Sequence, residues 1–312
     1  MFWRRIVGAT MSLGLGAYAI VSFFIADGLT HAERKAQEAS PSDYGVAFQE
    51  ASFSARGGEV NLSGWYLAGE QNRPALIFVH GINSTRSGEH SVDLATRLVR
   101  RGFTLLMFDL RGHGSSGGER ISGGYFERAD VLGAYDYLLS RGHKLGAMGV
   151  IGFSMGAAIS LLAAADETGI HAVVADSPFA VAAERINSEA ARKTRLPIWL
   201  TPVFMPTADV MAGAFYRIDI ASIAPERAAA RIPYPIFVIH GIADTRIPTA
   251  DGIRVHDAGQ PGSRLWLVPD ADHVKAFQNN PDEYVARVGD YFDQQLSSAS
   301  IRAIGSLAAE VR

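Results

Sequence analysis

The sequence predicts an α/β protein with a mostly parallel, doubly wound sheet, a helical insertion and an N-terminal transmembrane helix. Three observations lead to this fold class. Short apolar runs alternate with helical patterns over most of the 312 residues, polar residues directly follow several of these runs, and one long apolar segment stands near the N-terminus. Strands that alternate with helices pair in parallel, because each crossover helix returns the chain to the same end of the sheet.

The N-terminal segment predicts a membrane anchor. Arg4 and Arg5 precede an uncharged, mostly apolar run at 6–26, which ends at Asp27. At about 1.5 Å per residue, this run matches the thickness of the hydrocarbon core of a bilayer. A cleaved signal peptide, which has a shorter apolar part, and a buried soluble helix remain as alternatives. Arginines before the span favour a domain outside the cytoplasm, either anchored or, after cleavage, secreted or periplasmic.

The predicted strands are short apolar runs bounded by turn residues, as in strands that are buried on both faces. Helical patterns with apolar residues on one side separate these runs. We expect helices near 92–101, 125–139 and 155–165, and further helices after the last two strands. The predicted strands lie at 60–67, 75–79, 104–108, 147–153, 171–175, 235–239 and 264–268.

A proline-rich stretch at about 180–231 interrupts this alternation. Because it separates two predicted strands and is too long for an ordinary loop, it predicts a helical insertion over one end of the sheet. The residues between the apolar segment and the first strand are polar and predict a linker. The chain is thus divided into four parts: an anchor or signal segment (1–30), a linker (31–44), a domain that contains the insertion (45–298) and a C-terminal tail (299–312).

The composition excludes several kinds of chemistry. The chain has no cysteine, which excludes disulfides, thiolate nucleophiles and cysteine-bound metals. A formal net charge of −3 and the lack of any basic run predict that nucleic acid is not a partner. The composition gives no indication of the oligomeric state.

A G-x-S-x-G pattern, Gly152-Phe153-Ser154-Met155-Gly156, marks the candidate nucleophile. Glycines are needed on either side because a serine on a sharp strand-to-helix turn is crowded. The loop at 114–118 also fits the pattern and would offer Ser116 instead. The context favours Ser154, since a predicted buried strand precedes it and small residues that open an apolar helix follow it.

A serine hydroxyl needs a base, and the base needs an orienting carboxylate. His273 is the predicted base because it follows the last predicted strand, and the order serine, acid, histidine along the chain is the one this architecture uses. Asp244 and Asp176 each follow a predicted strand, so both remain candidates for the acid. Asp244 is favoured because Gly241 and Pro248 frame it in a tight loop.

The oxyanion of a tetrahedral intermediate needs hydrogen-bond donors that are fixed in advance. The turn at the candidate serine itself positions the amide of Met155. A second donor is expected from the loop after the strand at 75–79, and we predict the amide of Ile82. If the role of Gly81 is only to permit the turn, the second donor is instead an amide one position away from Ile82.

Four sequence blocks together resemble those of bacterial serine hydrolases of the α/β-hydrolase superfamily, over roughly 51–296. They are His80-Gly81, DLRGHGSS at 109–116, the pentapeptide at 152–156, and HGIADTRIP at 240–248. The resemblance implies an α/β-hydrolase fold, a cap formed by the insertion, and neither a metal nor an organic cofactor. It also implies that Asp109 belongs to a structural loop and takes no part in catalysis.

The resulting hypothesis is a serine hydrolase that cleaves a carboxylic ester through an acyl-enzyme on Ser154, with His273 as base and Asp244 as orienting acid. Its expected partners are a small acyl ester or peptide substrate and the membrane. Peptide hydrolysis of the aminopeptidase kind and acyl transfer are the alternative reactions. A membrane-tethered, hydrolase-like binding domain is the non-enzyme alternative, which a full set of candidate triad residues disfavours.

Overall fold

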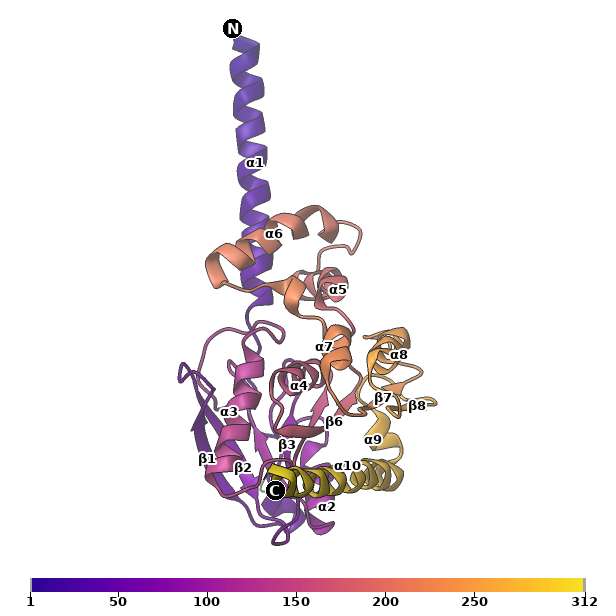
Figure 1. Ribbon diagram of the computed structural model, residues 1–312. Helices are drawn as coiled ribbons and strands as arrows, with labels where there is room; N and C mark the ends of the chain where they lie inside the picture. The colour runs from indigo at the N-terminus through magenta and orange to yellow at the C-terminus, as the bar shows by residue number, and fades with distance from the viewer. Residues whose placement is uncertain (1, 311–312) are drawn as a thin grey trace.

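An eight-stranded, mostly parallel sheet forms the centre of the protein (Figure 1). The computed structural model describes residues 2–310. The strand order is β1-β2-β4-β3-β5-β6-β7-β8. Strand β2 runs antiparallel to both of its neighbours, and the other pairs are parallel. The strands are β1 (Gln49–Ser54), β2 (Asn61–Leu67), β3 (Ala75–Val79), β4 (Thr104–Phe108), β5 (Met148–Phe153), β6 (Ile170–Asp176), β7 (Phe237–Gly241) and β8 (Arg264–Val268).

The predicted strands agree closely with the observed ones. The ranges 75–79, 104–108 and 264–268 match β3, β4 and β8 residue for residue, and the other predicted ranges differ from the observed strands by at most two residues at either end. The sequence prediction misses β1, whose residues are mostly exposed. An edge strand that is largely exposed has no continuous apolar run by which it could be recognised.

Helices cover both faces of the sheet, and the side chains of each strand alternate between the two resulting cores. In β3, for example, Ile77 and Val79 belong to the core beneath α3, α4, α7 and α8, while Leu76 and Phe78 belong to the core beneath α2, α9 and α10. These helices are α2 (Ser91–Arg100), α3 (Glu127–Ser140), α4 (Met155–Asp166), α7 (Pro225–Arg231), α8 (Thr249–Ala258), α9 (Ala276–Asn279) and α10 (Pro281–Glu310).

The residues between β6 and β7 are helical, as the sequence predicts. They form α5 (Ala182–Thr194), α6 (Thr201–Tyr216), the 3-10 helix η2 (Ile220–Ser222) and α7. Helices α5 and α6 lie beside α1 (Phe2–Leu29), whose N-terminal part projects beyond both (Figure 1). The C-terminal part of α1 packs against both helices in a small apolar cluster of Ile25, Ala26, Ala190, Met205 and Ala208.

Helix α1 has the length and composition of a membrane span. Its residues Arg5–Leu29 form a 25-residue segment with a mean hydropathy of 1.7, and only 17 % of its most apolar window is buried in the protein. The exposed side chains include Met11, Leu13 and Leu15. These properties suit a membrane anchor and also a signal segment.

The predicted linker at 31–44 lies along the domain and ends in the 3-10 helix η1 (Pro41–Tyr44). The Arg34 guanidinium donates hydrogen bonds to four carbonyl oxygens of the loop 113–118. Gln37 Nε2 donates to Asp109 Oδ2 at 2.9 Å. We call residues 31–40 the strap, because these bonds tie the end of α1 to the sheet.

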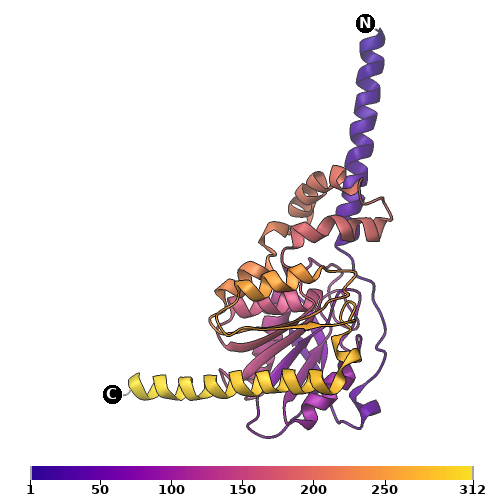
Figure 2. The ribbon, with the colours of Figure 1, turned by 90° about the vertical axis from the view of Figure 1, so that its right-hand side faces the viewer.

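The final helix, α10, extends past the body of the domain (Figure 2). It runs from Pro281 to Glu310 without a break, so it crosses the predicted boundary between domain and tail at residue 298. Residues 311 and 312 of the predicted tail lie outside the described residues. Before that boundary, Tyr284, Tyr291 and Phe292 of α10 are fully buried against the sheet.

Candidate active site

Ser154 lies at the sharp turn from β5 into α4. Its backbone has φ 54° and ψ −118°, and a positive φ is uncommon for residues other than glycine. The neighbouring glycines make this turn possible. A Cβ atom on Gly156 would lie 2.2 Å from the carbonyl oxygen of Val79, and one on Gly152 would lie 2.3 Å from that of Gly156. Close packing of the turn against β3 therefore fixes the Ser154 side chain at the carboxyl edge of the sheet.

The structure brings three of the predicted site residues together. His273 Nε2 lies 2.8 Å from Ser154 Oγ, and His273 Nδ1 lies 2.7 Å from Asp244 Oδ2. With its hydrogen on Nδ1, the imidazole donates to the carboxylate and accepts from the serine hydroxyl. The three residues follow β5, β7 and β8, whose parallel arrangement places their carboxyl ends at one edge.

The Asp244 carboxylate is kept ionised by several donors. Its side chain is fully buried, and its Oδ1 accepts from the amides of Arg246 and Ile247, both at 2.8 Å. Burial alone would raise the pKa of Asp244, but hydrogen bonds from His240 and His273 hold that pKa well below its ordinary value. Burial lowers the pKa of His240, but hydrogen bonds to Asp244 and to the carbonyl oxygen of Ile247 outweigh this effect, so the pKa is raised overall. A negative charge therefore remains beside His273.

Asp176, the other candidate for the acid, has different partners. Its fully buried carboxyl group accepts hydrogen bonds from Ser177 Oγ and Tyr284 OH, both at 2.9 Å. Burial raises the pKa of Asp176 to about 6. The side chain therefore links the end of β6 to α10, whereas His273 is bonded to Asp244.

Two buried histidines hold the loop that carries Ile82. His80 Nε2 accepts from the amide of Leu110 at 3.0 Å, and His113 Nε2 accepts from the amide of Asn83 at 3.3 Å. Burial, with a smaller effect of the neighbouring His113, lowers the pKa of His80 to about 3, and burial also lowers the pKa of His113. Both rings are thus neutral acceptors with a structural role in the loop.

The two predicted oxyanion donors have free amides. Met155 is the first residue of α4, so its N–H group has no acceptor within the helix. Within residues 2–310, the amide of Ile82 also has no protein acceptor. A Cβ atom on Gly81 would lie 3.4 Å from Ser154 Cβ. The loop after β3 therefore passes directly beside the serine, and its next amide is available there.

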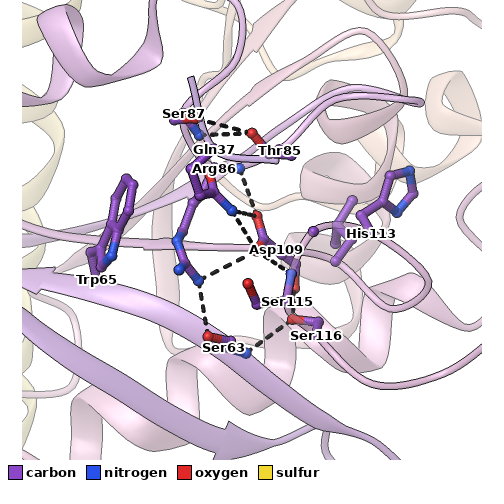
Figure 3. A network of polar contacts seen from close by, with 12 residues as sticks. Gln37, Ser63, Trp65, Thr85, Arg86, Ser87, Asp109, His113, Ser115 and Ser116 are labelled. Atoms are coloured by element: carbon purple, nitrogen blue, oxygen red, sulfur yellow. Dashed lines mark hydrogen bonds and ion pairs between the residues drawn. The ribbon is translucent and has the colours of Figure 1, made fainter. Parts of the chain in front are cut away.

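Asp109 lies in a buried polar network (Figure 3). Its carboxylate accepts from the amides of Arg86 and Ser115 at 2.8 and 2.9 Å, and it forms an ion pair with the Arg86 guanidinium at 3.3 Å. Gln37 of the strap is a further donor. Ser116, the alternative nucleophile, donates its hydroxyl to the Asp109 carbonyl oxygen at 2.5 Å. The network joins the strap, the loop after β3 and the glycine-rich loop after β4.

A cavity with a mostly apolar lining opens at Ser154. The side chains of Arg246 and Glu189, which also line it, form an ion pair at 3.3 Å. A cavity with this lining suits a ligand that carries an apolar group. One wall consists of residues from α1 and α6, namely Ala26, Leu29, Met205, Ala208 and Ala212.

Metal-ligating side chains do not gather at this site. Among residues 2–310, no group of three or more histidine, aspartate and glutamate residues is placed to hold a metal ion. The histidine and acidic side chains near Ser154 are bonded to one another instead.

Comparison with known proteins relates the chain to one family. Residues 70–224 match the family model described as serine aminopeptidase, S33. The esterase Pf2001 of Pyrococcus furiosus superposes with a TM-score of 0.69 and 26 % sequence identity, over 86 % of this chain and 98 % of the esterase. The chain is an α/β hydrolase.

Sequence relatives of this hydrolase include bacterial and vertebrate proteins. YqkD of Bacillus subtilis (strain 168) is 25 % identical over 240 residues, which cover 76 % of the hydrolase and 77 % of YqkD. Lysophosphatidylserine lipase ABHD12 of Danio rerio is 27 % identical over 214 residues, which cover 64 % of the hydrolase and 51 % of the lipase. The match to the family model and the superposition on the esterase Pf2001 confirm the superfamily and the fold class that the four sequence blocks predict.

Some features of the hydrolase site gave no signal in the sequence. Glu89 Oε2 accepts a long hydrogen bond, 3.4 Å, from the amide of Gly81, and burial raises the pKa of Glu89 to about 7. Arg34 and Gln37 hold the loops around Asp109 from outside the predicted domain. These residues belong to polar segments without periodicity, so only the fold shows where their side chains lie.

Asp176 should make the stability of the hydrolase depend on pH. The folded protein binds a proton on this carboxyl group more tightly, with a pKa of about 6, than an unfolded chain with the ordinary value of 3.8. Its contribution is therefore fully present below about pH 4 and is lost as the pH rises through about 6. Asp176→Asn should flatten this part of the pH dependence of the free energy of unfolding, measured by urea denaturation. A slope equal to that of the wild type would contradict the prediction.

Proposed function

We propose that this α/β hydrolase cleaves carboxylic esters through an acyl-enzyme on Ser154. The proposal rests on two consecutive hydrogen bonds, 2.8 Å between Ser154 Oγ and His273 Nε2 and 2.7 Å between His273 Nδ1 and Asp244. They lie at the opening of an apolar cavity. A nucleophilic serine requires a base within hydrogen-bond reach and a carboxylate that orients this base.

In the acylation step, Ser154 Oγ attacks the carbonyl carbon of the ester while its proton passes to His273 Nε2. The tetrahedral intermediate then breaks the bond to the alcohol oxygen, and His273 returns the proton to the departing alcohol. Asp244 stays ionised throughout and stabilises the imidazolium that forms between the two transfers. The low pKa of Asp244 suits this role, because the carboxylate does not take the proton from the imidazole.

The negative charge of the intermediate requires two donors in place. We assign these to the amides of Met155 and Ile82, neither of which is used by a protein acceptor in the described chain. A donor of this kind contributes about 3 to 4 kcal/mol to transition-state stabilisation. The histidines His80 and His113 keep the Ile82 loop in position through backbone amides.

In the deacylation step, water takes the place of the alcohol. His273 accepts a proton from the water molecule, whose oxygen attacks the acyl carbon, and the bond to Ser154 Oγ breaks as His273 returns the proton to that oxygen. The product is a carboxylic acid. An acyltransferase would use a second alcohol in this step, so the acceptor that reaches the acyl-enzyme distinguishes the two reactions.

The insertion acts as a cap that shapes the acyl site, since α5 and α6 contribute side chains to the cavity. The names of the esterase Pf2001 and of the lipase ABHD12 agree with an ester substrate. The S33 description suggests aminopeptidase activity as the second candidate. An aminopeptidase needs an acidic group for the substrate's ammonium, and Asp209 in the cavity is the available one, because Glu189 is paired with Arg246.

We also propose that helix α1 anchors the hydrolase in a membrane, with the catalytic domain outside the cytoplasm, an orientation that the arginines before the span favour. The length and hydropathy of Arg5–Leu29 support the anchor. External protease should then digest the domain in spheroplasts with an intact inner membrane. Protection until the membrane is permeabilised would reverse the orientation.

Asp244 rather than Asp176 should control turnover. Asp244→Asn removes the charge that stabilises the imidazolium and is expected to lower kcat on p-nitrophenyl butyrate by about 10³- to 10⁴-fold. Asp176→Asn, a matched change at the other candidate acid, should lower kcat by less than about tenfold, since its carboxyl group is bonded to Tyr284. A larger loss for Asp176→Asn than for Asp244→Asn would overturn the assignment.

The apolar cavity should make the hydrolase prefer esters with an extended acyl chain. In a series of p-nitrophenyl esters assayed beside aminoacyl anilides, kcat/KM should rise with chain length above acetate, because apolar area is buried in the cavity. Ser154→Ala is the background control. Faster cleavage of the aminoacyl anilides than of every ester would favour the aminopeptidase function instead.

A further inference from the structure

Helix α6 leaves large apolar side chains uncovered along its length. Asp209 is the single charged residue among its sixteen residues. Val203 and Val210 (70 % exposed) lie on the side of α6 turned away from the cavity. Trp199 (75 % exposed) lies just before the helix, and Phe215 is exposed near its C-terminal end. Apolar patches of this kind mark an interaction surface when they lie on a soluble domain.

The position of α6 is fixed relative to α1. The rings of Tyr18 and Phe204 stack with centroids 5.4 Å apart, and Tyr18 OH donates to the carbonyl oxygen of Val203 at 2.8 Å. Phe23 and Phe215 make an edge-to-face contact at 5.8 Å. Helix α6 therefore crosses α1 beside residues 18–26, as Figure 1 shows.

The length of α1 determines the depth of this crossing in a bilayer. Residues 5–17 lie beyond the crossing and are about 20 Å long at 1.5 Å per residue. The hydrocarbon core is about 30 Å thick, so this part of the helix is too short to span it. The whole segment Arg5–Leu29 is long enough. If α1 crosses the membrane, residues 18–26 lie within the bilayer, and the helix packed against them lies there too.

Charged residues mark where this immersed region ends. Asp27, at the end of α1, accepts hydrogen bonds from Arg120 at 2.9 Å and from Tyr216 OH at 2.7 Å. Lys193, at the end of α5, donates to the carbonyl oxygen of His31 in the strap. Basic residues stand at both ends of α6, namely Arg192, Lys193 and Arg195 before it and Arg217 after it. An apolar helix flanked by basic and aromatic residues is typical of a helix at the level of the lipid headgroups.

We propose that α6 lies in the bilayer surface beside α1, with its exposed apolar face against lipid acyl chains, and that the cavity receives an acyl ester directly from this leaflet. The opposite face of α6, with Met205, Ala208 and Ala212, lines the cavity together with Leu29 of α1. One helix thus separates the lipid from the space above Ser154. The identity of the substrate as an ester rests on the proposed catalytic function, and the position of α6 rests on the proposed membrane anchor α1.

The absence of cysteine in the sequence allows a direct test of the position of α6. Single cysteines replace Val210, Trp199 and, as a control, Leu145. Leu145 is similarly exposed (67 %) but lies before the N-terminal end of β5, at the opposite end of this strand from Ser154. Each full-length variant is labelled with a nitroxide and reconstituted into phosphatidylcholine–phosphatidylglycerol vesicles. Electron paramagnetic resonance then measures how strongly oxygen and a water-soluble nickel chelate relax the label.

The labels at Val210 and Trp199 should have a several-fold higher ratio of oxygen to nickel accessibility than the label at Leu145, because oxygen concentrates in the hydrocarbon. Equal ratios at the three positions would overturn the proposal. Dipolar broadening at Val210 that disappears on dilution with unlabelled protein would also overturn it, because a second copy of the chain would then cover α6.

Delivery of the substrate is tested separately by Val210→Asp, with Val210→Leu as the matched control. Turnover of a long-chain acyl ester embedded in the vesicles should fall about tenfold in Val210→Asp, since a charge on this face opposes contact with hydrocarbon. Turnover of soluble p-nitrophenyl acetate should stay unchanged, because Val210 does not line the cavity. Equal turnover of the embedded ester by both variants would overturn lateral delivery.

Wild-type protein without activity on either ester would overturn the proposed function, while the label accessibilities would still decide where α6 lies.

Discussion

The packing of β3 against the first residues of α4 holds the backbone of Ser154 at a positive φ, and the rest of the site is arranged around this turn. The carbonyl oxygen of Val79 leaves no room for a side chain at Gly156. The same contact sets the separation between the turn and the loop after β3, which carries Ile82. A change that widened this contact would move the hydroxyl away from the amides that we propose for the oxyanion.

Surroundings, more than residue type, separate the histidines of this rim into two roles. His80 is fully buried, and burial with the nearby His113 lowers its pKa to about 3, so it remains neutral and holds a backbone amide. His273 is partly accessible and is bonded both to the ionised Asp244 and to Ser154, as the base that we propose must be. Asp109 keeps the neighbouring loops in place through Arg86, so the reactive groups lie on a rigid support.

Much of this arrangement could be predicted from the sequence because parallel strands end at a common edge. Ser154 directly follows β5, and Asp244 and His273 lie in the loops after β7 and β8, so their place after parallel strands brings them to one rim. The choice between Asp244 and Asp176 depends on side-chain reach, which a sequence does not contain. The strap and the contribution of α1 to the cavity wall were also missed, since contacts such as that of Arg34 with the loop 113–118 arise only from long-range packing.

The central claim is that Ser154 is the nucleophile, and covalent labelling tests it most directly. The folded full-length protein is treated with a fluorophosphonate. An activated serine oxygen attacks its phosphorus and displaces fluoride, and the modified peptide is sequenced by mass spectrometry. We predict stoichiometric modification of Ser154 that is absent in Ser154→Ala and strongly slowed in His273→Ala. Folded wild-type protein that remains unmodified, or that carries the adduct on Ser116 instead, would contradict the account.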